Sequence, residues 1–183
     1  MKLNKLQKKI GISFKDDKLL IQALTHKSFD TKNNYEKLEF LGDRVLGFVI
    51  SKKLLELYPN EKVGMIDKKL ANLVNKNKCF EIGKELELDN YILTGNTEKK
   101  KKVNIEKKII SDCCESLIGA IYIDKGFEVS SKFILNYWKN YLNLSDITVI
   151  DSKTRLQEYS LKKFKALPIY KLISNTGPRH KPN

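Results

Sequence analysis

Segment 35–58 constrains this chain most, because it combines an apolar-rich helical pattern with three carboxylates in its first half. It reads YEKLEFLGDRVLGFVISKKLLELY and stops before Pro59, a residue that cannot continue a helix. An α-helix turns by about 100° per residue, which places Glu36, Glu39 and Asp43 within roughly 60° of one another. A helix that is apolar nearly all round is typically buried, so the charges on it require partners.

Two interpretations of this acidic face are open. The simpler one is a solvated polar surface, the ordinary place for carboxylates on a helix. The alternative is a metal site, because Lys37 and Arg44 lie off the acidic arc and a divalent cation would neutralise the cluster. The chain has 35 Lys and Arg residues against 22 Asp and Glu residues. The lack of lysine on this face therefore favours the metal site.

A second segment, 105–126, repeats the combination of apolar residues with acids. Asp112 and Glu115 are three positions apart and lie one turn apart on the same helical face. If the two helices face each other, Glu39 and Asp43 join this pair in one pocket. Hard oxygen ligands of this kind suit Mg²⁺.

The rest of the first 144 residues also follows helical spacing. The predicted helices are 17–26, 35–58, 68–86, 105–126 and 127–142. Asp67 is the expected N-cap of the third helix, and Gly126 is expected to end the fourth. Glycines at 42, 47 and 119 should let the two acidic helices approach closely. An irregular basic loop is predicted over 88–104.

The chain changes character after residue 145. Residues 146–150 are predicted to be a linker, 153–166 an amphipathic helix, and the segment after Pro168 a strand. One helix and one strand cannot bury a core of their own, so this second module is expected to be incomplete.

Charge and cysteine content limit the class of partner and the compartment. The formal net charge of +13 points to an anionic partner, with nucleic acid the first choice. The sequence has neither a secretory signal pattern nor a run of about 18 apolar residues, so no membrane association is expected. Three cysteines without metal-site spacing indicate reduced thiols in a cytoplasm.

Four motifs resemble those of the ribonuclease III family and occur in the family's order. They are ALTHKS at 23–28, EKLEFLGDRVLG at 36–47, KKLANLVN at 68–75 and SDCCESLIGAIYIDKG at 111–126. Residues 151–183 resemble the start of the double-stranded-RNA-binding domain that follows in bacterial members. The fold that this resemblance implies is all-α: a ribonuclease III endonuclease helical domain, then an incomplete α-β-β-β-α module. The implied domains are 1–145 and 151–183, joined by a linker at 146–150.

The resemblance also implies an activity. It is that of a homodimeric endonuclease that cuts double-stranded RNA with Mg²⁺, for which Mn²⁺ substitutes. The products carry 5′-phosphate and 3′-hydroxyl ends with short 3′ overhangs, and the substrates are ribosomal and other structured RNA precursors. The alternative is a catalytically silent relative that binds double-stranded RNA or the ribosome.

The family's site residues map onto matching acids of this chain. Glu39, Asp43, Asp112 and Glu115 are the implied metal ligands, and Asp43 and Glu115 are also the implied catalytic residues. Glu36 matches an earlier acid of the signature and is the weaker candidate.

The same resemblance singles out two further sets of residues. Arg44 stands where the family usually has a small residue, and we expect it to lie on the surface or face RNA rather than to pair with Asp43 or Glu39. In the second module the implied RNA contacts are Thr154, Gln157, Glu158 and His180.

Overall fold

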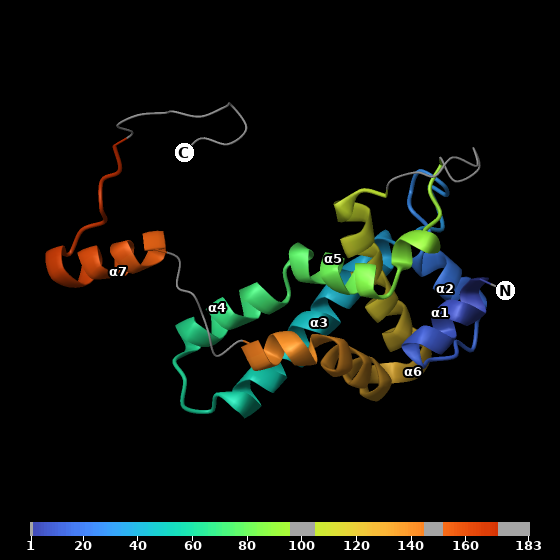
Figure 1. Ribbon diagram of the computed structural model, residues 1–183, viewed down its shortest axis with the longest axis horizontal. Helices are drawn as coiled ribbons and strands as arrows, with labels where there is room; N and C mark the ends of the chain where they lie inside the picture. Colours follow the sequence, from blue (N-terminus) through green and yellow to red (C-terminus); the bar gives the residue numbers. More distant parts are fainter. Residues whose placement is uncertain (1, 96–104, 145–151, 172–183) are drawn as a thin grey trace. The chain divides into compact units, whose positions relative to one another are not determined.

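The computed structural model describes residues 2–95, 105–144 and 152–171, and these ranges are built from helices (Figure 1). The chain divides into two compact units, Met1–Asp146 and Ile147–Asn183. The helices of the first unit are α1 (Lys2–Ile10), α2 (Asp17–Ala23), α3 (Glu36–Leu57), α4 (Val63–Leu73), α5 (Lys76–Glu85), the 3₁₀ turn η1 (Leu88–Asn90) and α6 (Lys107–Leu144). The second unit holds α7 (Ser152–Phe164). Within the described ranges no strand forms apart from one isolated bridge, Thr25 to Leu93, which agrees with the predicted all-α class.

Helices α3 and α6 are the two long helices of the first unit, and they pack against each other more extensively than any other pair (Figure 1). Helix α3 matches the predicted segment to within one residue at each end. Helix α6 is interrupted at Gly126, which has φ 80° and ψ −178°. A positive φ favours glycine, so the predicted end of the acidic helix is confirmed, although the next helix follows without a loop.

Two glycines let the α3 and α6 backbones touch. A Cβ at Gly42 would overlap the carbonyl oxygen of Glu115, and a Cβ at Gly119 would overlap the carbonyl oxygen of Leu38. The predicted close approach is therefore confirmed at positions 42 and 119. It is wrong for Gly47, because no atom lies within 4 Å of a Cβ built there.

The predicted single helix 68–86 is in fact two helices. Helix α4 begins at Val63, so Asp67 lies inside it and is not its N-cap. Asn75 caps α5 instead, because its side chain accepts hydrogen bonds from the backbone N–H groups of Asn77 and Lys78. The Leu73 carbonyl, which would accept from residue 77 in a continuous helix, accepts from the Trp138 indole N–H at 2.8 Å. A side-chain cap and a tertiary contact together break the helix.

Helix α3 is not buried all round, contrary to the expectation from its apolar pattern. The fully buried side includes Leu46, Ile50 and Leu54 in the main core. Phe40 and Phe48 lie on the other side and are 65% and 61% exposed. One face of α3 is thus apolar and open in the single chain.

The second unit is described by its helix and a short extension. Residues 165–171 follow α7 without regular structure, so the described part of the predicted strand, 169–171, forms none. The rest of that strand, and the loop residues 96–104, lie outside the described residues. No helix in the described ranges is long and apolar enough to cross a membrane.

We expect Gly42→Ala to destabilise the first unit strongly. The added methyl meets backbone rather than a flexible side chain, so α3 and α6 must move apart. Overpacking of this kind costs about 3 kcal/mol or more. Urea unfolding followed by circular dichroism measures the change. Gly64→Ala adds the same methyl where no atom lies within 4 Å, and its effect should stay within about 0.5 kcal/mol. Equal unfolding free energies for the two variants would contradict the close contact.

Candidate active site

Three carboxylates from α3 and α6 converge on one point beside the Gly42 contact. Glu39 comes from the first turn of α3, while Asp112 and Glu115 come from successive turns of α6. One oxygen from each lies within 4.8 Å of the others. Asp112 and Glu115 are only 3% and 2% exposed, and Glu39 is partly buried. The predicted meeting of the two acidic helices is therefore present in the structure.

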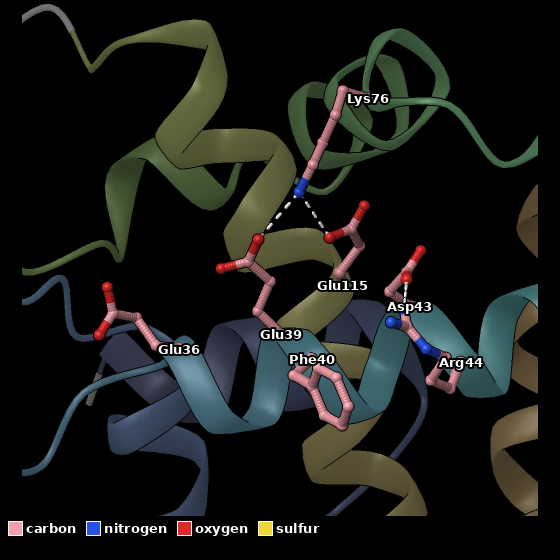
Figure 2. Close-up of a pocket in the computed structure, with 7 residues that line it drawn as sticks. All are labelled: Glu36, Glu39, Phe40, Asp43, Arg44, Lys76 and Glu115. Carbon is pink, nitrogen blue, oxygen red and sulfur yellow. Dashed lines mark hydrogen bonds and ion pairs between the residues drawn. The ribbon is translucent and has the colours of Figure 1, made fainter.

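A lysine from a third helix reaches into this cluster (Figure 2). The Lys76 ammonium lies 2.9 Å from Glu39 Oε1, 2.6 Å from Asp112 Oδ1 and 2.7 Å from Glu115 Oε2. Lys76 is the first residue of α5, so the Asn75 cap determines where its side chain begins. All three N–H donors of the ammonium are directed at carboxylates.

Burial and mutual contact shift the ionisation of this cluster. Burial is the largest influence on Glu115 and raises its pKa, while Lys76 offsets part of that rise. Burial lowers the pKa of Lys76, but its hydrogen bonds to Asp112, Glu115 and Glu39 outweigh that effect, so its pKa lies above the ordinary value. Lys76 is therefore a stable ammonium. One positive charge faces three carboxylates, so the cluster still attracts further positive charge.

Asp43 and Glu36 are not part of the three-carboxylate cluster, but they line a pocket that Glu39 and Glu115 also line (Figure 2). The Arg44 guanidinium donates to Asp43, and it also lies 4.7 Å from the centre of the Phe40 ring. The Glu36 carboxylate accepts from Lys27 at 3.0 Å. Arg44 is exposed, as expected, but it also forms the ion pair with Asp43. The pocket has a volume of about 450 Å³ and opens to solvent.

The donor set fits a divalent metal ion. Glu39, Asp112 and Glu115 offer hard carboxylate oxygens from two rigid helices, as Mg²⁺ requires. A cation, the Lys76 ammonium, already lies among these oxygens, which shows that their geometry accommodates positive charge. The adjoining pocket leaves room for the waters that Mg²⁺ retains.

The predicted RNA contacts of the second unit are only partly described. Gln157 lies on α7 and is partly buried. The side chains of Thr154 and Glu158, and all of His180, lie outside the described residues. Their assignment stays a prediction.

Lys76 is the site residue that sequence reasoning missed. The acidic face of 35–58 indicates that a cation is needed, but the nearby cations of that segment, Lys37 and Arg44, lie off the acidic arc. The remaining signal was Asn75, a strong N-cap residue directly before Lys76 in the middle of the supposed helix 68–86. A break there would have placed a lysine at a helix start.

Comparison with known proteins places the chain in a family. A sequence profile described as Ribonuclease-III-like matches residues 16–142. Ribonuclease 3 of Pelagibacter ubique (strain HTCC1062) is 64% identical, over the whole of this chain and 82% of that protein. Ribonuclease 3 of Agrobacterium fabrum (strain C58) is 39% identical, over 99% of this chain and 77% of that protein.

A solved structure agrees with the sequence matches. The nuclease domain of ribonuclease III from Campylobacter jejuni superposes with a TM-score of 0.69 at 36% identity, covering 76% of this chain and 97% of that one. That structure is described as flexible in a region involved in dimer formation. With the profile, the relatives and the fold in agreement, this chain belongs to the ribonuclease III family.

Proposed function

We propose that the chain is a Mg²⁺-dependent endonuclease that cuts double-stranded RNA, including ribosomal and other structured precursors. Convergence of Glu39, Asp112 and Glu115 on one point carries this proposal. A relative without catalytic function would be free to lose this cluster, and the chain retains it. The enzyme class follows from the relatives, which are ribonucleases 3 by name.

We propose that the residues of the pocket have different roles in phosphodiester cleavage. We assign Glu39, Asp112 and Glu115 to hold the divalent ion, and Asp43, which lies one turn after Glu39 on α3, to join them in the pocket. The bound ion supplies an activated water and neutralises negative charge on the scissile phosphate. Mn²⁺ also prefers oxygen ligands and should substitute. Glu115 and Asp43 orient the attacking water, and Glu36, paired with Lys27, has a minor role at the rim. The proposed products carry 5′-phosphate and 3′-hydroxyl ends with short 3′ overhangs.

The positive charge of the chain supplies affinity for RNA. A net charge of +13 attracts the phosphate backbone and makes binding depend on salt. We propose a catalytic domain at 1–145, a linker at 146–150 and a partial RNA-binding module at 151–183. In that module Thr154, Gln157, Glu158 and His180 are the proposed RNA contacts. Free cysteines at 79, 113 and 114 suit a cytoplasmic enzyme.

The exposed face of α3 supports a homodimer. Phe40, Phe48 and Leu55 share this face, with Leu55 58% exposed. Several large apolar side chains exposed on one helix face are typical of an interaction site in soluble proteins. Because Phe40 also lines the acidic pocket, we propose that the dimer contact lies next to each catalytic site.

Glu115→Gln should abolish most of the RNA cleavage. The change keeps the side-chain shape but removes one of the proposed ligand charges, so we expect a loss of about 10²- to 10³-fold in rate. The assay incubates a long RNA duplex with Mg²⁺ at low salt and follows its length on a gel. Glu56→Gln removes an acid from the far end of α3, where it pairs with Lys53, and should cut normally.

Two results would contradict this proposal in different ways. An unmodified chain that leaves the duplex intact in Mg²⁺ is not the proposed nuclease. Equal cutting by the unmodified chain and Glu115→Gln would instead show that the acidic cluster is not the site. Chelation of the metal should stop cleavage by the unmodified chain, and added Mg²⁺ should restore it.

Phe40→Ser should weaken the proposed dimer. Truncating a buried aromatic at the centre of an interface typically costs about 2 kcal/mol or more, which is roughly a 30-fold rise in the dissociation constant. Sedimentation equilibrium measures this constant. Phe29→Ser removes another half-exposed phenylalanine that is not on α3 and should leave it unchanged. A monomeric unmodified chain at micromolar concentration would rule out the dimer.

A further inference from the structure

Lys76 makes every ion pair that the three clustered carboxylates have within the described residues. It belongs to α5, so it is anchored independently of the two helices that carry the acids. The Asn75 cap fixes its backbone, and the N–O distances of 2.6–2.9 Å are those of strong charge-assisted hydrogen bonds.

The acids need this cation when no metal is bound. Asp112 and Glu115 are almost completely buried, one turn apart, with Glu39 close by. Bringing like charges together away from water is strongly unfavourable unless an opposite charge is present. Lys76 provides that charge and satisfies one oxygen of each carboxylate. Under these conditions it stabilises the folded α3–α6 contact.

The same position cannot hold both cations. A divalent ion held by these three carboxylates would take the space between the same oxygens. The ammonium nitrogen occupies the space between the same three oxygens. Steric overlap and repulsion between positive charges therefore make the two occupants mutually exclusive. The Lys76 side chain is 51% exposed, so it can swing into the open pocket without disturbing the core.

We propose that Lys76 is a built-in counter-ion, a positioning residue that keeps the acidic cluster ordered until metal binds and that metal must displace. This inference rests on the proposed function, because it requires the acidic cluster to be the metal site. The metal affinity then depends on how much more strongly the three carboxylates bind the metal ion than the Lys76 ammonium. Substituting residue 76 changes that difference in binding free energy.

Metal binding measured without RNA tests the proposal. Mn²⁺ is titrated calorimetrically into the chelator-treated full chain and into Lys76→Met, which has a similar length but no charge. We expect Lys76→Met to bind Mn²⁺ about 10- to 100-fold more tightly, the range over which neighbouring groups tune metal sites. Its melting temperature without metal should fall below that of the unmodified chain, and its rise on adding Mn²⁺ should be larger.

Two control variants isolate the position and the charge. Lys78→Met removes a lysine from the same helix, where it pairs with Glu81 outside the cluster, and should leave the Mn²⁺ affinity unchanged. Lys76→Arg keeps the charge and should retain the metal-free melting temperature and the weak Mn²⁺ affinity. If Lys76→Met is unfolded without metal, Mn²⁺ should restore its structure; an unfolded state that Mn²⁺ does not reverse would overturn the proposal.

The remaining outcomes separate this inference from the proposed function. Mn²⁺ affinity in Lys76→Met that equals or falls below that of the unmodified chain overturns the counter-ion role alone. If Glu115→Gln binds Mn²⁺ as well as the unmodified chain does, the acidic cluster is not the metal site, and both proposals fail together.

Discussion

The close contact between the backbones of α3 and α6 is the constraint on which the rest of the structure depends. Gly42 and Gly119 remove the side chains that would hold these helices apart. The carbonyl oxygen that approaches Gly42 belongs to Glu115, so the contact point and the acidic cluster share a residue. Helix packing with ordinary side chains keeps axes about 8–10 Å apart. Without glycines at the crossing, Glu39 and the two acids of α6 would belong to separate surfaces.

This geometry creates an electrostatic problem, and the protein resolves it from a third helix. Buried carboxylates of like charge oppose folding, and the neighbouring segments of α3 and α6 bring no cation among them. The start of α5 supplies one, and its position depends on the cap at Asn75 and on the Leu73 carbonyl that Trp138 engages. In the proposed role of Lys76, stability without metal and affinity for metal are linked through one ammonium group.

Local patterns predicted the elements that carry the acids but not the residue that neutralises them. Helix α3, the break at Gly126 and the pairing of Asp112 with Glu115 follow from periodicity, turn chemistry and spacing. The start of α4 was missed because Ile66 packs on the core and extends the helix before Asp67, a tertiary effect. Lys76 was missed for a similar reason: its neighbours in space come from α3 and α6, which no window around residue 76 contains. The exposure of Phe40 could not be predicted either. An apolar pattern shows that a helix face packs against something, but not whether that surface belongs to the same chain or to another molecule.

The indole of Trp138 has an experimental consequence beyond its role in packing. The sequence contains one tryptophan, so the tryptophan fluorescence of the chain, excited where its tyrosines do not absorb, comes from a single, fully buried ring. That ring donates its N–H to the last residue of α4, three positions before Lys76. Its emission therefore reports the state of the α4–α5 junction without any added label. The protein contains its own optical probe of the segment that positions the lysine, readable in real time while ions or nucleic acid are mixed with it.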